Sequence, residues 1–524
     1  MKISTRYTIG IFVLSFLAWS AGVGFFSSCI SEEDYLTDRS AQLNFSSDTL
    51  TFDTVFTTMG SITRAICVYN PHNDPILIDR VFLGGGKSSP YRLNIDGDTA
   101  LVARNVEIQP HDSLFIFARV TINPNNSNNP LLVRDSIVFE FNRKRQYLQL
   151  VAFGQDAYYH IPDYTSNRYL ITHDSRGKEI RRYYSLAHEQ PLLRGCEVSG
   201  NKLRWKSNKP HVVFDLCVVD SAYELTLPAG TKVFMANQAE FWVYTGGSLK
   251  MTGEEQNPVV VQGMRRDGYY KELPGQWSRL WLIAGSKDNV FENAIIKNGG
   301  IGVMADTCVN NNPTLFMKNV EISNMSHHGI WSRGATVEGI NVIVKNVGKC
   351  AVNLELGGTY RFVHSTFANY WNYDIRKYPT LNLQNYYKYS DRIVYERPMV
   401  RAEFYNCLIY GSKTGEEIKI DESYFPLTQY LFDHCLLAMK PVQDAEHFIE
   451  CLFQKDPLFT DPGEHDVHLT QKSPAIGKAN SVWTQSFAPK DHDGVLRSLP
   501  ASIGAYEFVP EPPKKIKATA IRSR

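Results

Sequence analysis

The densest group of side chains suited to ligand binding is a run of aromatic residues between positions 369 and 400. Tyrosine and tryptophan present a flat apolar ring with one polar atom, so exposed clusters of them stack on sugars or anchor protein partners. The same rings could equally pack back onto the body of the protein, and the sequence leaves both interpretations open. The predicted binding residues are Tyr370, Trp371, Tyr373, Tyr378, Tyr386, Tyr387 and Tyr389.

Groups suited to catalysis are scattered along the chain. A polysaccharide lyase needs a base that abstracts a proton and a cation that stabilises the developing charge, whereas a glycoside hydrolase needs two carboxylates at a defined separation. None of the candidates forms a recognisable motif, so we assign no catalytic residue and interpret the histidine pair among them as a surface turn. The candidates are Asp391-Arg392, Asp374 with Arg376 and Lys377, and His327-His328.

Metal and cofactor sites are not expected. The chain has no CxxC or Cys/His ligand spacing and no Walker, Rossmann or zinc signature, so we predict no metal and no cofactor. Asp491-His492-Asp493 could suggest calcium or a catalytic acid, but closely spaced acids in a loop more often cap turns, and we expect a structural role. The net charge of +1 gives no large field that would attract nucleic acid, and we expect no nucleic-acid partner.

A repeat between residues 293 and 453 would position these groups. Short segments such as Asn319-Val320-Glu321-Ile322 recur with alternate apolar residues, and a period of about 20 to 30 residues is typical of a solenoid. The alternation predicts that the second residue of each segment points inward and stacks on its equivalents in neighbouring units. These second residues are at positions 294, 320, 342, 366, 407, 435 and 451.

The alignment predicts two more columns. Three cysteines occupy the same position of their units, and we favour buried free thiols over disulfides for them. Three asparagines follow the aligned apolar residues by four positions, and we interpret them as a ladder of turn residues, not as ligands. The cysteines are Cys407, Cys435 and Cys451, and the asparagines are Asn298, Asn324 and Asn346.

The stretch before the repeat resembles the entry turns of bacterial right-handed parallel β-helix proteins of the pectate-lyase-like superfamily. The matching residues are 225–231, 244–249, 257–261 and 274–277. The resemblance implies a right-handed parallel β-helix over residues 196–455, with an insertion at about 369–400.

Residues 456–508 resemble the choice-of-anchor-type C-terminal module of anchored surface proteins. The matching residues are Asp456-Pro457-Leu458-Phe459, Ser473-Pro474-Ala475-Ile476 and Ile503-Gly504-Ala505-Tyr506-Glu507. The resemblance implies a module that closes the open end of the helix, where an exposed strand edge invites aggregation. We expect residues 509–524 to be a disordered tail.

Residues 44–154 contain short alternating segments separated by turn signals, a pattern that favours a β-sandwich. The segment resembles bacterial Ig-like modules through Phe52-Asp53-Thr54-Val55, Val68-Tyr69-Asn70 and Ile108-Gln109-Pro110. Residues 155–195 would then be a connector. The expected fold class is therefore all-β, with an N-terminal Ig-like β-sandwich followed by a right-handed parallel β-helix.

The N-terminus indicates export. Lys2 and Arg6 precede an apolar run that extends from Ile9 to Phe26. This pattern fits a signal peptide over residues 1–28 better than a membrane anchor. Phe26-Ser27-Ser28-Cys29 resembles a bacterial lipobox, which implies that Cys29 carries the lipid and that residues 29–43 form a lipidated linker. The acids at 32–34 resemble the surface-export signal of Bacteroidota lipoproteins.

These features predict an outer-membrane lipoprotein that is lipid-anchored and faces the cell exterior. We expect a non-catalytic binding or assembly module for a glycan or an outer-membrane protein partner. The alternative is a carbohydrate-active β-helix enzyme, either a polysaccharide lyase or a glycoside hydrolase, because a fold alone does not decide function. A groove that combines two carboxylates, or a carboxylate with Lys or Arg, would favour the enzyme, and an aromatic platform without such groups would favour binding.

Overall fold

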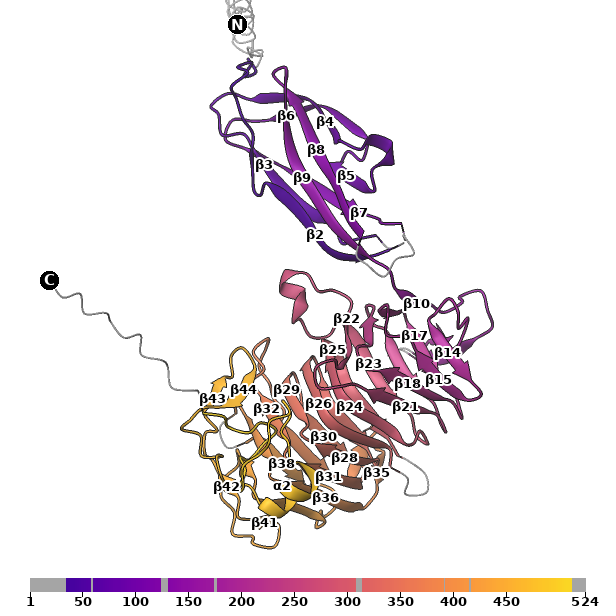
Figure 1. Cartoon of the computed structure of the whole chain (residues 1–524), viewed down its shortest axis with the longest axis vertical. Helices are drawn as coiled ribbons and strands as arrows, with labels where there is room; N and C mark the ends of the chain where they lie inside the picture. The colour runs from indigo at the N-terminus through magenta and orange to yellow at the C-terminus, as the bar shows by residue number, and fades with distance from the viewer. Residues whose placement is uncertain are drawn as a thin grey trace, which may run out of the picture. The chain divides into compact units, whose positions relative to one another are not determined.

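The computed structural model describes residues 34–57, 60–123, 131–173, 177–307, 313–390, 392–413 and 416–510. The predicted signal peptide, Cys29 and nearly all of the predicted tail lie outside these residues, as does Asp391. The chain divides into two compact units, Met1–Gln155 and Asp156–Arg524 (Figure 1). No helix of the described residues is long and apolar enough to cross a membrane.

The first unit is a sandwich of two β-sheets. One sheet has the strand order β1-β3-β7-β5 and the other has the order β2-β9-β8-β4-β6. Alternate residues of the strands are apolar and buried, and they fill one core between the two sheets. The strands are β1 Asn44–Phe45, β2 Thr49–Phe56, β3 Arg64–Tyr69, β4 Ile76–Leu83, β5 Tyr91–Ile95, β6 Val102–Ile108, β7 Ser113–Val120, β8 Leu131–Phe141 and β9 Lys144–Gln155, with the 3-10 turn η1 Gly86–Ser88.

The second unit is a parallel β-helix, in which successive coils add strands to three stacks. The first stack contains β15 Lys202–Trp205, β18 Glu224–Pro228, β21 Ser248–Thr252, the first halves of β24 Asn289–Lys297 and β26 Leu315–Met325, β28 Thr336–Ile340, β31 Gly358–Val363, β36 Met399–Tyr405, β39 Tyr430–Asp433 and β41 Phe448–Ile449. The second stack contains β10 Tyr158–His160, β16 His211–Val213, β19 Lys232–Met235, β22 Val259–Gly263, the second halves of β24 and β26, β29 Ile343–Val347, β32 Thr366–Asn369, β37 Leu408–Gly411, β40 Leu436–Leu437 and β42 Leu452–Phe453. The third stack contains β13 Ser185–Leu186, β17 Leu216–Val219, β20 Glu240–Val243, β23 Trp277–Leu282, β25 Gly299–Asp306, β27 His328–Arg333, β30 Val352–Glu355, β33 Leu381–Gln384 and β38 Ile418–Asp421.

Strands of successive coils pair in parallel within each stack, as β28 does with β31, β29 with β32 and β30 with β33. The first and second stacks belong to one 20-stranded sheet, and the third is a separate nine-stranded sheet. The remaining elements are β14 Cys196–Ser199, the hairpins β11 Tyr169–His173 with β12 Glu179–Tyr183, β34 Tyr386–Lys388 with β35 Val394–Glu396 and β43 Phe459–Asp461 with β44 Asp466–Leu469, the 3-10 turn η2 Gly268–Lys271, and the helix α2 Ser481–Phe487.

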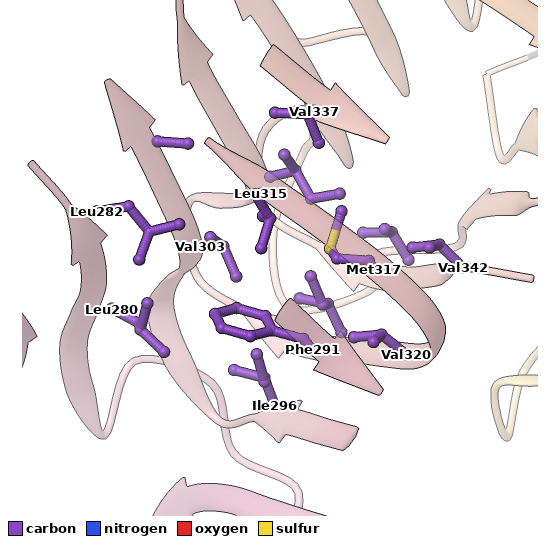
Figure 2. Packing of buried hydrophobic residues seen from close by; sticks show 14 of the residues in the cluster. Leu280, Leu282, Phe291, Ile296, Val303, Leu315, Met317, Val320, Val337 and Val342 are labelled. Carbon is purple, nitrogen blue, oxygen red and sulfur yellow. The ribbon is translucent and has the colours of Figure 1, made fainter. Parts of the chain in front are cut away.

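The inward-facing column predicted from the repeat is confirmed except at Thr366. This residue pairs with the outward-facing residues Ile343 and Leu408, so that Ser365 takes the inward position in that coil. Ala294 pairs with Val320, and Ile322 pairs with Val344 in the next coil. All four, together with Val342, belong to one buried cluster. Figure 2 shows Val320 and Val342 within this cluster. Because alternate side chains of a strand point to opposite faces, every second residue of each coil is removed from water.

The cysteine column is confirmed as well. The leucines that directly follow Cys407, Cys435 and Cys451 pair with one another in successive coils. All three cysteines carry free thiols, and the amide of Cys407 donates to Sγ of Cys435 at 3.4 Å.

The asparagine ladder also has its predicted role. Asn298, Asn324 and Asn346 have positive φ angles of 67°, 55° and 52°, in the left-handed region that asparagine tolerates. Nδ2 of Asn346 donates to Oδ1 of Asn324 at 2.7 Å, so the turns of neighbouring coils are joined by side-chain hydrogen bonds.

The structure differs from the predictions in two places. The segment 369–400 is not one insertion, because it contains β33, a strand of the third stack, with one excursion before this strand and another after it. The C-terminal module packs against outward-facing side chains of the second stack, including Ile343, Leu408 and Leu436, and so lies along several coils instead of across the last one. These outward residues are apolar because the module removes them from water.

Candidate functional site

The outer face of the third stack carries a row of large side chains. Trp242, Trp281, Met304 and Trp331 are partners in successive coils. The residue that follows each of them in its strand is fully buried, so strand alternation turns the row to the outside. The row spans about 14 Å, because neighbouring strands are about 4.8 Å apart.

Carboxylates fix the indoles of this row. Nε1 of Trp281 donates to Asp306 at 2.9 Å, and Nε1 of Trp331 donates to Glu355 at 2.6 Å. A ring whose orientation is already fixed loses little conformational freedom when a ligand stacks on it. The row is therefore organised before any ligand arrives.

Arginine side chains lie between the indoles. Arg333 makes two hydrogen bonds of 2.7 Å to Asp306, and its guanidinium carbon is 5.8 Å from the centre of the Trp331 ring. The guanidinium carbon of Arg279 is 4.5 Å from the centre of the Trp281 ring. These cation–π contacts further restrict the rings and place positive charge beside their apolar faces.

A groove of about 810 Å³ opens on this face. Its lining includes Trp331, His327, His328 and Lys349, together with residues of β12, β20 and β23. Its volume is in the range of ordinary ligand sites. Trp242 is buried in a small apolar cluster against which Trp281 also packs. Trp281 and Trp331 are half-buried, and of these two Trp331 lines the groove.

Glu240 is the most heavily bonded carboxylate of the groove. It accepts hydrogen bonds from Arg279 at 3.0 Å, Ser278 at 2.9 Å and Trp242 at 2.5 Å, and it forms a 3.0 Å ion pair with Arg182. Burial alone would raise its pKa, but Arg279 and Arg182 outweigh burial and hold the pKa below its usual value. The two arginines thus favour the charged form of Glu240, and its oxygens are used by neighbouring side chains.

Glu355 and Asp306, on strands β30 and β25 of this stack, are also occupied. Glu355 accepts hydrogen bonds from Trp331, from Asn353 at 3.2 Å and from Gln384 at 3.3 Å, and burial raises its pKa. Asp306 is held by Arg333 and Trp281. Either group would have to give up these bonds before it could attack or protonate a substrate.

Two groups in the groove retain unused bonding capacity. Nδ1 of His328 is buried without a hydrogen-bond partner, and burial together with the charge of Lys349 lowers the pKa of His328 to about 3. Among the described residues no carboxylate forms a salt bridge with Lys349, whose Nζ lies 5.6 Å from the centre of the Tyr378 ring. The groove therefore offers a neutral imidazole and an uncompensated ammonium group.

The seven aromatic residues predicted to bind a ligand do not form one surface. Tyr370 packs against Phe459 of the C-terminal module, with ring centres 6.1 Å apart. Trp371 is buried and donates to Asp374, and its ring centre is 4.9 Å from that of Tyr373. These three rings serve to pack the first excursion onto the helix.

The other four are dispersed as well. Tyr386 is buried and donates to Asp421 at 2.8 Å, and Tyr389 is exposed on the β34–β35 hairpin. Only Tyr378, beside Lys349, and Tyr387, whose ring centre is 5.6 Å from the guanidinium carbon of Arg333, adjoin the groove residues or the aromatic row.

The charged candidates have varied outcomes. Arg376 is buried in an ion pair of 2.5 Å with Glu417 and holds the first excursion in place, so it is unsuited to catalysis. The interpretation of His327-His328 as a surface turn is wrong for His328, which begins β27 and is 8% exposed. A single sequence could not show that this residue pairs with Ile301 of the previous coil.

The acids near the C-terminus are structural, as expected. Asp491 accepts hydrogen bonds from the amides of Asp493, Val495 and Glu507 at 3.0, 2.8 and 2.8 Å. In the part of the chain that the structure describes, no group of three or more His, Cys, Asp or Glu side chains is arranged to hold a metal ion.

The tryptophan row was missed because the alignment followed the second stack only. The loops that lead into the third stack vary in length, so Trp242, Trp281 and Trp331 have no constant spacing from the aligned residues. A usable signal exists in Phe241-Trp242-Val243 and Leu280-Trp281-Leu282, where a tryptophan stands between two inward-facing apolar residues.

Comparisons with known proteins give only distant similarities. No protein-family model matches the chain, and no curated protein matches it. Among solved structures, the enzymatically active domain of tailspike protein 2 from bacteriophage CBA120 aligns at 10% identity and a TM-score of 0.25, over 59% of this chain and 47% of that one. The periplasmic alginate epimerase AlgG aligns at 11% identity and a TM-score of 0.21, over 58% of this chain and 85% of that one.

A family 123 glycoside hydrolase from Clostridium perfringens aligns at 8% identity and a TM-score of 0.17, over 22% of this chain and 28% of that one. The chain thus spans about a quarter of the hydrolase and about half of the tailspike domain. Similarities this weak do not bear on function, and the β-helix assignment rests on the strand pairing itself.

Proposed function

We propose that the protein binds a glycan along the outer face of the third stack and does not cleave it. The observation that carries this proposal is the pair of half-buried indoles, Trp281 and Trp331, each fixed by a carboxylate beside an open groove. The apolar face of a sugar ring can stack on such indoles while its hydroxyls reach the surrounding polar groups.

The state of the carboxylates supports binding over hydrolysis. Glu240 with Arg279 satisfies the sequence-based criterion for an enzyme, since the groove combines a carboxylate with a cation. However, Glu240, Asp306 and Glu355 each accept at least two hydrogen bonds from neighbouring side chains, whereas the lining carboxylate Asp215 is exposed and bonded to Tyr164. A hydrolase needs two available carboxyl groups, one to protonate the leaving group and another to activate water or attack.

The proposal also includes the location of the protein in the cell envelope. A lipid on Cys29 would anchor the chain to the outer membrane with the β-helix facing the exterior, as the lipobox-like and acidic segments suggest. The N-terminal sandwich would act as an Ig-like spacer, the helix would be right-handed, and an outer-membrane protein could be a further partner. Replacing Cys29 with Ala should release the protein from the membrane fraction, and retention of the variant in that fraction would contradict the anchor.

Substitution of Trp331 tests glycan binding. On a glycan array, followed by titration of the best ligand, W331A should weaken affinity about tenfold, because a central aromatic contact typically contributes more than 1.4 kcal/mol. W331F keeps a ring and should retain more of the affinity. Trp483 on α2 is also half-buried and stacks on Tyr405 at 3.6 Å, so W483A is the matched control and should bind normally.

Two results would refute the proposal. One is that the parent protein binds no glycan on the array, and the other is that W331A binds as tightly as W483A while both remain folded.

A lyase-type enzyme is the second candidate, and His328 is the observation that favours it. His328 lines the groove together with Lys349, and its buried Nδ1 has no hydrogen-bond partner. Proton abstraction requires a base and a cation, and Nδ1 would have to become exposed to act as that base. Incubation with the bound glycan should then yield shorter or unsaturated products, and H328Q should abolish them without abolishing binding. An unchanged ligand after prolonged incubation would exclude this candidate.

A further inference from the structure

We infer that the Lys349 end of the groove recognises a negatively charged substituent, a carboxylate or a sulfate, on the bound glycan. This inference rests on the proposed function and deepens it. It concerns which glycans bind, whereas the proposal above concerns whether the aromatic row binds glycans.

The first step is the position of Lys349 in the groove. Its amide donates to the carbonyl of His327 at 2.7 Å, which ties it to the coil that carries the two histidines. Its side chain lines the same groove as Trp331. In the described part of the chain no carboxylate neutralises it, and its Nζ faces the ring of Tyr378 instead. A sugar that stacks on Trp331 would therefore approach an ammonium group that has no carboxylate partner.

The second step is the charge on the rest of the groove. The cations Arg182 and Arg279 share the single carboxylate of Glu240, so this group of three also carries a net positive charge. Asp215 is the other acidic residue of the lining, and it accepts a hydrogen bond from the hydroxyl of Tyr164. The lining thus contains three cationic side chains and two carboxylates, and an anionic ligand complements this excess.

The third step is the environment of the two histidines. His328 is 8% exposed, and its Nδ1 has no partner. Burial and the charge of Lys349 both lower the pKa values of His327 and His328. A bound anion would offset the positive potential that Lys349 creates at this point, whereas a neutral sugar would leave Lys349 without an anionic partner.

The test is a glycan microarray that pairs each acidic glycan with its methyl-esterified or desulfated form, probed with the full chain. The parent protein should bind the acidic member at least about tenfold more tightly, because a charge-assisted hydrogen bond contributes more than a neutral one. K349M should remove this preference, so that the acidic and neutral members of each pair bind the variant equally. Lys440 is exposed and outside the groove lining, so K440M removes the same charge and should keep the preference.

Competition and salt provide independent readouts. Inorganic sulfate should compete with the acidic members and not with their neutral forms, and added salt should weaken only the acidic members, since salt screens exposed charges. Carboxylated and sulfated pairs on the array show which of the two substituents is preferred. Equal competition against acidic and neutral forms would contradict a charge-specific position.

The outcomes separate the two claims. If acidic and neutral members bind the parent equally, or if K349M keeps the preference, the charged-substituent inference is wrong while the aromatic row can still bind glycans. If W331A leaves both members bound as in the parent, the proposed function itself fails.

Discussion

Acid should weaken the start of the β-helix through two buried histidines. His211 and His160 are both fully buried, and Nε2 of His160 lies 2.9 Å from Nδ1 of His211. The other nitrogen of His211 lies 2.8 Å from the carbonyl oxygen of Lys206, and the His211 ring stacks on Trp205 with ring centres 4.3 Å apart. Burial lowers the pKa of His211 from 6.5 to about 4, and the pKa of His160 is lowered as well.

The sign and size of the effect follow from proton linkage. Between pH 4 and 6.5 the unfolded chain binds a proton at His211 that the folded chain does not bind, so stability falls as the pH is lowered through this range. For His211 alone, lowering the pH from 7.5 to 5 should cost about 2 kcal/mol of unfolding free energy. The same burial acts on His160, so the combined loss should be larger.

Urea unfolding followed by tryptophan fluorescence, with hydrogen exchange across residues 158–213, measures this loss. H211Q should be less stable at pH 7.5, because a packed ring is lost, but its stability should change less between pH 7.5 and 5. An identical pH dependence in the parent and in H211Q would refute the argument, as would unchanged exchange in this segment at pH 5.

Two further substitutions test the packing that surrounds the site. R376M leaves the fully buried Glu417 without its ion-pair partner and should lower the free energy of unfolding by about 3 to 5 kcal/mol. The double variant R376M/E417Q should recover part of that loss. Equal urea midpoints for the single and the double variant would contradict the reasoning. N346A removes the hydrogen bond to Asn324 and places alanine at a φ of 52°, which should cost about 1 to 2 kcal/mol, while N346G should lose less in the same unfolding measurement.

The aromatic residues of segment 369–400 show why composition alone does not locate a binding surface. Tyrosine has an apolar ring and a polar hydroxyl, so it can either pack against the wall of the β-helix or stack on a ligand. Tyr386 uses its hydroxyl on Asp421 and Tyr370 uses its ring on Phe459, so both stabilise the chain. Whether a tyrosine packs or binds a ligand depends on which surfaces come together in the fold, and those surfaces belong to coils that are distant in sequence.

The coils themselves were readable from the sequence because their signal is local. Alternation of apolar residues within four-residue segments, and asparagines four positions later, depend only on strand geometry and on the turn that follows it. That is why the columns through Val320, Cys435 and Asn324 agree with the structure.

The position and composition of the candidate site depend on tertiary contacts alone. Trp281 and Trp331 belong to one row, with Met304 between them, because parallel pairing aligns β23, β25 and β27. Loops of unequal length hide that register in the sequence. The unpartnered Nδ1 of His328 and, among the described residues, the absence of a salt bridge to Lys349 likewise depend on which side chains other coils bring to the groove. Local periodicity determines that a chain winds into coils, whereas the chemistry of its outer face depends on contacts between coils.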